Sequence, residues 1–341
     1  MADRGGRLGR GGCPVRVRCP PRSSESRTEA LSSAGVKVWI PHEHGQSLLG
    51  DLPAGATVEV AAEPDRLPSP VADVRFWVPP FLAEAKTADL LRELPDLEVV
   101  QLLTAGADAW VGRIPPGVTL CDARGVHDSG TSEWVVAAIL AHLRSFPAHV
   151  RAQDRREWAY REVAPTDELA GKRVLIVGAG SIGTALKARL APFEVGLTLV
   201  ARTARPGVHA VTELPRLLPE ADVVVLLVPL TEHTRGLVDE DFLAAMRDGA
   251  LLVNAARGPV AQTKALVAEL GTGRISAVLD VTDPEPLPAD NPLWAMPNVL
   301  LTPHVAGSVQ GLLARAYRLV GDQIRRYAAG EPPTNVVVEG Y

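Results

Sequence analysis

The chain has 341 residues, too many for one ordinary hydrophobic core and enough for two domains. Its net charge of −5 gives no reason to expect nucleic acid as a partner, and no apolar run approaches the roughly 18 residues of a membrane-spanning helix. Three cysteines are too few for a disulfide framework and fit a reducing cytoplasm. We therefore expect a cytoplasmic protein that binds neither nucleic acid nor a membrane.

Residues 1–35 contain seven Arg and six Gly but few apolar residues. This composition cannot bury a core, so we expect a disordered basic tail. A basic tail can contact an anionic partner. A flexible extension without a partner, or a start codon assigned too early, explains the composition as well and is favoured.

The first strand is expected at Val36–Ile40, a β-rich run that ends at Pro41. Strand-like runs then alternate with helix-like stretches such as Thr87–Glu93, which indicates βαβ units and a parallel sheet. The further strands of this first series are expected at Thr57–Val60, Val74–Val78, Leu97–Leu102 and Val118–Cys121.

A long helical pattern follows at about residues 132–151. Ser132 or Thr131 can cap its N-terminus, and Pro147 is expected to bend or interrupt it. The polar segment of residues 151–169 is expected to be an exposed excursion.

A second, more regular α/β series begins at Lys172. After it, residues 308–328 again have a helical pattern, and we expect this last helix to return to the first domain. The strands of the second series are expected at Arg173–Val177, Leu197–Ala201, Val223–Val228, Ala250–Asn254, Ile275–Asp280 and Val299–Leu301. Its helices are expected at Ser181–Ala191, Glu240–Met246 and Thr263–Glu269.

The sequence Gly178-Ala179-Gly180-Ser181-Ile182-Gly183 lies between a predicted strand and a predicted helix. The first glycine permits a tight turn, the second lets the backbone approach a pyrophosphate, and the third lets helix and strand pack closely. Free N–H groups at the helix start then face the phosphates. A glycine-rich turn without a ligand is the alternative, but this context favours a dinucleotide-binding loop.

The residues after the next strand indicate which dinucleotide is bound. An Asp or Glu there would bond the ribose 2′-hydroxyl of NAD, but this chain has Ala201-Arg202-Thr203-Ala204-Arg205. Arg202 and Arg205 can hold a 2′-phosphate, and Thr203 can add a hydroxyl. A solvated arginine pair on an exposed loop is the alternative. We predict NADP(H) in preference to NAD(H).

Three polar side chains follow successive strands of this second series: Arg257, Glu285 and His304. Ligands bind at the carboxyl ends of strands in open α/β sheets, so we expect the three to converge beside the nicotinamide. Reduction of a 2-oxo acid needs a cation for the carboxylate and the developing oxyanion, which Arg257 supplies. It also needs a proton donor, which His304 supplies, and Glu285 can orient that imidazole and favour its protonated form.

Together these segments closely resemble the D-isomer-specific 2-hydroxyacid dehydrogenases, from about residue 36 to the C-terminus. The resemblance implies two Rossmann-like domains with the active site in the interdomain cleft. The substrate-binding domain would comprise residues 36–126 and 306–341, and the dinucleotide-binding domain residues 127–305. The segments that carry the resemblance are the glycine motif, Val228-Pro229-Leu230-Thr231, Asn254-Ala255-Ala256-Arg257-Gly258, Asp280-Val281-Thr282-Asp283-Pro284-Glu285-Pro286 and Thr302-Pro303-His304-Val305-Ala306-Gly307.

The family's catalytic Arg, Glu and His match Arg257, Glu285 and His304, and its Asp that contacts the nicotinamide carboxamide matches Asp280. The turn that begins at Leu103 resembles the family's substrate-carboxylate loop. Expected substrate-binding residues are Thr104, Ala105, Gly106, Arg257 and His304. Expected cofactor-binding residues are Gly178, Gly180, Ser181, Ile182, Gly183, Arg202, Thr203, Arg205, Val228, Pro229, Thr234, Ala255 and Asp280. No metal is expected.

The resemblance also implies a homodimer held by the long helix and the arm after it, where Trp158 is a candidate specificity residue. The Arg202 region looks like that of NADPH-dependent glyoxylate/hydroxypyruvate reductases. Formate dehydrogenases share the fold but typically carry Gln where Glu285 stands, which makes formate an unexpected substrate. The alternative function is a nicotinamide-sensing interaction protein, similar to the co-repressors that share this fold.

Overall fold

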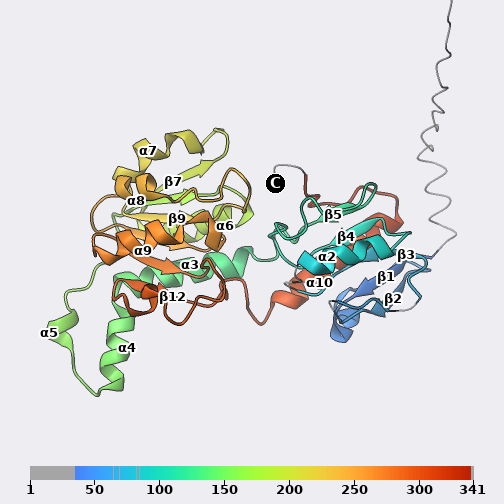
Figure 1. Cartoon of the computed structure of the whole chain (residues 1–341), viewed down its shortest axis with the longest axis horizontal. Helices are drawn as coiled ribbons and strands as arrows, with labels where there is room; N and C mark the ends of the chain where they lie inside the picture. Colours follow the sequence, from blue (N-terminus) through green and yellow to red (C-terminus); the bar gives the residue numbers. More distant parts are fainter. Residues whose placement is uncertain (1–34, 64, 69, 82, 84, 339–341) are drawn as a thin grey trace, which may run out of the picture.

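The computed structural model describes residues 35–338 except residues 64, 69, 82 and 84. These residues form two lobes, each built on a parallel sheet, that lie side by side along the long axis of the molecule (Figure 1). The prediction of an α/β fold with parallel sheets is confirmed. The predicted disordered tail lies outside the described residues, apart from Gly35 at its end.

The first lobe contains five strands in the order β2-β1-β3-β4-β5, and all neighbouring strands are parallel. Apolar residues cover both faces of this sheet, which explains why its central strands read as apolar runs. The elements before the crossover are β1 Lys37–Ile40, η1 Glu43–Leu48, β2 Thr57–Val60, β3 Val74–Trp77, α2 Ala85–Asp89, η2 Leu90–Glu93, β4 Val99–Gln101 and β5 Thr119–Cys121.

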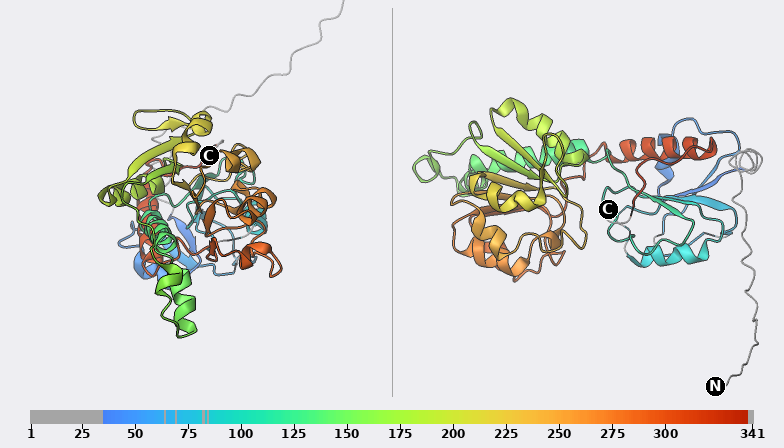
Figure 2. Two further views of the ribbon diagram at one scale, coloured as in Figure 1. Left: turned by 90° about the vertical axis from the view of Figure 1, so that its left-hand side faces the viewer. Right: turned by 90° about the horizontal axis from the view of Figure 1, so that it is seen from above.

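The last helix, α10 (Leu312–Ala328), packs against the first sheet although it follows the second lobe in sequence. Its side chains Tyr317, Val320 and Ile324 are buried in one apolar cluster with residues of β1 and β3. Figure 2 shows α10 lying along the first lobe, with its N-terminal end near the junction of the lobes. The helix begins four residues later than the pattern at residues 308–328 predicted.

The second lobe contains seven parallel strands in the order β12-β11-β10-β9-β6-β7-β8. The sequence did not predict β8, a two-residue edge strand. The strands are β6 Arg173–Val177, β7 Gly196–Ala201, β8 His209–Ala210, β9 Val223–Leu226, β10 Leu251–Asn254, β11 Ser276–Leu279 and β12 Val299–Leu301. The helices are α6 Ser181–Leu190, η3 Ala191–Phe193, η4 Val211–Glu213, α7 Leu214–Leu217, η5 Leu218–Glu220, α8 Glu240–Ala245, η6 Gly258–Val260, α9 Thr263–Gly271 and η7 Pro292–Ala295.

The predicted long helix is two helices, α3 (Asp128–Leu143) and α4 (Phe146–Asp154). They are separated at Ser145, which has a left-handed φ of 53°. Pro147 does not break a helix, because it lies in the first turn of α4, where its missing N–H would have had no partner. The N-cap of α3 is His127, so the prediction of Ser132 or Thr131 as the cap was wrong.

Helix α4 and the short α5 (Tyr160–Val163) project from the second lobe as an arm (Figure 1). The sequence predicted an exposed polar excursion here, but the arm also carries exposed apolar side chains. Trp158 is 95% exposed and Tyr160 is 70% exposed, and Phe146 and Val150 are exposed as well. No helix in the described ranges is both long enough and apolar enough to cross a membrane.

Candidate active site

The glycine-rich loop joins β6 to α6 at the edge of a groove. Gly178 has a φ of 123°, which L-residues rarely adopt, and it makes the turn out of the strand. A Cβ on Gly183 would overlap the carbonyl oxygen of Gly178, so this glycine allows helix and strand to pack. Gly180 has open space around the position of its missing Cβ and lines the groove, as a backbone approached by a ligand requires.

The groove has a volume of about 410 Å³ and is bordered by residues after β6, β7 and β9. None of the described residues that line it is acidic. The Arg205 guanidinium lies on the loop and donates from Nη2 to the carbonyl oxygen of Ala179 over 2.7 Å. The Thr234 hydroxyl donates to the carbonyl of Pro229 over 2.6 Å and braces the far wall. Expected cofactor residues on this groove are Gly178, Gly180, Arg202, Thr203, Arg205, Val228, Pro229 and Thr234.

Ser181 is another expected cofactor residue, but it does not line the groove. Its hydroxyl donates to the carboxylate of Asp128 at the start of α3. The hydroxyl therefore ties the loop helix to the crossover helix. Three other expected cofactor residues, Ile182, Ala255 and Asp280, line a second cavity between the lobes instead of the groove.

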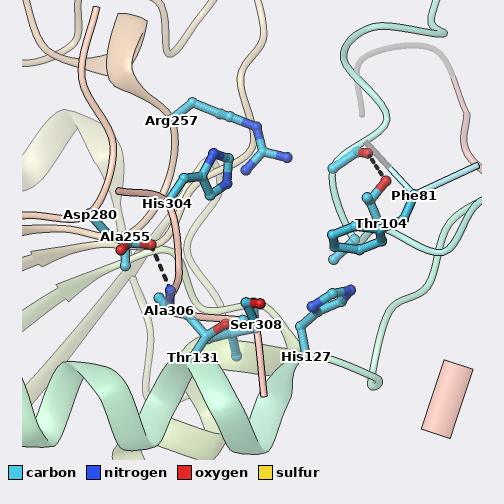
Figure 3. A pocket seen from close by; sticks show the side chains of 14 residues that line it. Phe81, Thr104, His127, Thr131, Ala255, Arg257, Asp280, His304, Ala306 and Ser308 are labelled. Atoms are coloured by element: carbon cyan, nitrogen blue, oxygen red, sulfur yellow. Dashed lines mark hydrogen bonds between the residues drawn. The ribbon is translucent and has the colours of Figure 1, made fainter. Parts of the chain in front are cut away.

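This interlobe cavity has a volume of about 140 Å³, which suits a small ligand. Arg257 and His304 enter it from the second lobe, and Thr104 and Phe81 face them from the first lobe (Figure 3). All five expected substrate-binding residues line it. The complete lining comprises Phe81, Thr104, Ala105, Gly106, His127, Thr131, Ile182, Ala255, Arg257, Asp280, His304, Ala306, Gly307 and Ser308.

The imidazole of His304 is paired with a carboxylate. Its Nδ1 lies 2.7 Å from Oε1 of Glu285, so Nδ1–H donates to Glu285 and Nε2 is left for a ligand. Glu285 itself does not line the cavity. The structure therefore brings all three expected catalytic side chains together: Glu285 bonds His304 from outside the cavity lining, and Arg257 lies beside His304 in the cavity (Figure 3).

Buried Asp280 organises the turn that carries His304. Its carboxylate accepts hydrogen bonds from the Thr302 hydroxyl over 2.6 Å and from the N–H groups of Val305 and Ala306, both over 2.9 Å. Its carbonyl oxygen accepts from the N–H of His304 over 2.7 Å. The expectation for Asp280 was a contact with nicotinamide, and the geometry adds this structural role.

The predicted domain boundary at residue 127 places His127 at the crossover between the domains, but the sequence did not predict its place in the cavity, nor that of Phe81. The His127 ring stacks on Phe81 with centroids 6.3 Å apart, and its Nε2 bonds the carbonyl of Leu103 over 2.9 Å. Burial lowers the pKa of His127, and the positive charges of Arg257 and Arg315 act in the same direction. The lowered pKa favours the neutral imidazole, and Nε2 is the donor because the carbonyl oxygen of Leu103 can only accept. A His directly before the long helix was the only sequence signal for it.

The lobe with the glycine loop and the neighbouring cavity together define an oxidoreductase that uses a nicotinamide dinucleotide. The chain belongs to the D-isomer specific 2-hydroxyacid dehydrogenases, because the family model of their NAD binding domain matches residues 136–306. The predicted family and enzyme class are confirmed.

A glyoxylate reductase from Thermofilum pendens is 33% identical over 75% of this chain and 79% of its own length. The chloroplastic/mitochondrial formate dehydrogenase of Arabidopsis thaliana is 29% identical over 90% of this chain and 82% of its own length. The crystal structure of an NADPH-dependent glyoxylate/hydroxypyruvate reductase from Sinorhizobium meliloti, in complex with NADP and sulfate, is similar with a TM-score of 0.76 and 28% identity. That similarity covers 91% of this chain and all of the other. These relatives are enzymes, so the alternative of a sensing protein is not favoured.

Proposed function

We propose that the protein is an NADPH-dependent reductase that converts a small 2-oxo acid of the glyoxylate or hydroxypyruvate type to the D-2-hydroxy acid. One observation carries this proposal. The His304–Glu285 pair and Arg257 enter a cavity of about 140 Å³ between the lobes, beside a glycine loop suited to a dinucleotide. Such a cavity fits an acid of a few heavy atoms better than a bulky one.

The residues present fit a dinucleotide. Gly180 leaves room for a pyrophosphate, and Gly183 lets the loop pack closely enough to present the helix N-terminus. When bound, the dinucleotide supplies the hydride. Arg202, Thr203 and Arg205 would hold a 2′-phosphate at a groove whose described lining has no carboxylate, which supports NADP(H) over NAD(H).

The chain's own side chains perform the remaining steps. Arg257 would bind the substrate carboxylate and polarise the oxo group, since a guanidinium offers several donors in one plane. His304 would hold a proton at Nε2 and deliver it to the carbonyl oxygen at C2. Glu285 keeps the other ring nitrogen, Nδ1, bonded at 2.7 Å, which fixes the direction in which Nε2 points. The backbone of Thr104, Ala105 and Gly106 would receive the substrate carboxylate.

Formate is not the substrate in this proposal, although formate dehydrogenases are among the relatives. Glu285 stands where those enzymes typically carry Gln. Formate lacks the C2 carbon whose oxo group His304 would protonate, so the proton donor would have no acceptor.

The assembly and the division into domains are also proposals. The arm with Trp158 and Tyr160 exposes more aromatic surface than a solvated monomer surface usually carries, which supports a homodimer built on α3 and the arm. Packing of α10 on the first sheet supports a substrate-binding domain of residues 36–126 and 306–341, with residues 127–305 as the dinucleotide-binding domain. The cytoplasm is the proposed location.

Steady-state assays with a panel of 2-oxo acids test the function. We expect glyoxylate or hydroxypyruvate to be reduced with NADPH and His304→Ala to lower kcat by at least about a hundredfold. The variant should bind NADPH as the wild type does, because His304 does not line the dinucleotide groove. If no acid is reduced with either dinucleotide, or if His304→Ala retains full activity, the proposal fails.

A further inference from the structure

Arg257 forms an ion pair across the cleft with Asp108 of the opposite lobe. Its Nε lies 3.2 Å from Oδ1 of Asp108, in the loop that also carries Thr104 and Gly106. Both side chains are mostly covered, with 26% and 29% of their surfaces exposed. An ion pair with this degree of burial is less screened than a pair on the open surface.

The other donors of Arg257 show which nitrogen of the guanidinium is left for a ligand. Nη1 donates to the carbonyl oxygen of Ala256 over 2.8 Å. With Nε on Asp108 and Nη1 on Ala256, two edges of the planar guanidinium are fixed. Among the described residues, Nη2 forms no hydrogen bond. Nη2 is therefore the part of Arg257 that is available to a substrate.

Gly106 shows where Nη2 lies. A Cβ on Gly106 would overlap Nη2 and would come within 2.7 Å of Cζ of Arg257. The guanidinium thus lies directly against the backbone of the substrate loop. That loop is braced internally, since the Thr104 hydroxyl donates to the carbonyl of Gly106 over 2.7 Å. A rigid loop can hold a partner group in one orientation.

We propose that Asp108 is the positioning residue of Arg257: it takes Nε and holds the guanidinium against Gly106, so that Nη2 faces the substrate. This inference rests on the proposed function, because it assigns to Arg257 the binding of the 2-oxo acid. The pair is monodentate, because the carboxylate bonds Nε and leaves Nη2 without a hydrogen-bond partner among the described residues. Asp108 does not touch the reacting atoms and acts through Arg257.

The carboxylate of Asp108 should have two opposite effects on catalytic efficiency, one through kcat and one through KM. Its carboxylate orients Arg257, which favours a high kcat, but its negative charge repels an anionic substrate, which raises KM. Asp108→Asn keeps an oxygen that accepts from Nε and removes the charge. We expect this variant to keep kcat within about threefold of the wild type while KM for the acid falls about two- to fivefold.

Asp108→Ala removes both the charge and the acceptor. We expect kcat to fall about tenfold or more with the best acid of the panel, because the guanidinium is no longer held. In an Arg257→Lys background the same substitution should change kcat less than about twofold, since lysine has no Nε–H for Asp108 to hold. This dependence on Arg257 separates positioning from a general structural effect.

The matched control is Asp89→Ala. Asp89, like Asp108, forms an ion pair with an arginine. Its partner is Arg113 of its own lobe, over 3.4 Å, and neither residue lines the cavity or the groove. This variant should have wild-type kcat and KM. The thermal midpoint and the Kd for NADPH of each variant are measured beside the kinetics. If Asp108→Ala does not fold, the isosteric Asp108→Asn decides, because it should keep kcat and lower KM for the acid.

The inference is overturned if Asp108→Ala lowers kcat equally in the wild-type and Arg257→Lys backgrounds. It is also overturned if Asp108→Asn loses kcat as fully as Asp108→Ala. In both cases the proposed function stands as long as Arg257→Lys and His304→Ala impair reduction. If the wild type reduces no acid, the proposed function fails first.

Discussion

Alanine substitutions at Gly180 and Gly183 of the glycine-rich loop should have different effects, one on cofactor binding and the other on stability. A Cβ on Gly183 would overlap the carbonyl oxygen of Gly178 and lie 3.1 Å from its carbonyl carbon. Gly178 cannot retreat easily, because its N–H donates to Val200 over 2.9 Å and its φ is 123°. A Cβ on Gly180 would meet nothing within 4 Å, and the φ of this residue is −81°, which alanine adopts freely.

The magnitudes follow from these contacts. Gly183→Ala forces strand and helix apart, and such overpacking costs about 1–3 kcal/mol of unfolding free energy. Gly180→Ala should leave the apoprotein within about 0.5 kcal/mol of the wild type. Its methyl group, however, would lie on the groove, where a bound pyrophosphate would approach the backbone. We expect its Kd for NADPH to rise at least about tenfold, equivalent to about 1.4 kcal/mol.

Thermal unfolding without dinucleotide and titration of NADPH fluorescence measure the two effects. Gly183→Ala should lower the Tm of the apoprotein by several degrees. Gly180→Ala should leave that Tm unchanged but lose most of the rise in Tm that NADPH gives to the wild type. A Gly180→Ala variant that binds NADPH with wild-type affinity would refute the assignment of this loop to the pyrophosphate.

Three further predictions concern single side chains. Glu285→Gln keeps an oxygen near Nδ1 of His304 but loses the charge, and steady-state kinetics should show kcat lower by about tenfold or more with little change in KM. Arg202→Asp should raise KM for NADPH at least about tenfold and favour NADH, and equal wild-type efficiency with both dinucleotides would contradict the NADP(H) proposal. The pKa of His127 is lowered by folding, so the unfolded chain takes up the proton first as the pH falls below about 6.5. The free energy of unfolding should therefore fall by up to about 1.4 kcal/mol for each pH unit below that value. Denaturant unfolding at about pH 7.5 and 5.5 should show a smaller drop for His127→Asn.

The strands and the convergence of Arg257, Glu285 and His304 could be predicted because each has a local signal. The bounds of β6 and β12 agree with the predicted runs Arg173–Val177 and Val299–Leu301, where strongly apolar residues lie between polar ones. The end of a parallel strand also places its next polar residue at the ligand edge of the sheet. That rule was sufficient to bring Arg257, Glu285 and His304 together.

The parts that could not be predicted depend on contacts between distant segments. The break between α3 and α4 occurs at Ser145, and a left-handed serine has no strong sequence signature, whereas nearby Pro147 has one. Phe81 and His127 come from separate loops and meet only in the folded chain. The Asp108–Arg257 pair spans 149 positions and both lobes, so no spacing in the sequence could reveal it.

His304, the proposed proton donor, is held from three directions, and this explains how a strained residue can keep one orientation. Its φ of 53° is in the left-handed region, which costs a non-glycine residue about 1–3 kcal/mol. Asp280 offsets this cost through its carbonyl, which accepts from His304, and its carboxylate, which accepts from the next two N–H groups. Glu285 then fixes the ring at Nδ1. In the proposed mechanism, Arg257 is held in the same manner from the other lobe. Both groups that would face the ligand are then oriented by carboxylates outside the reacting atoms, so the cavity would be preorganised before a ligand enters.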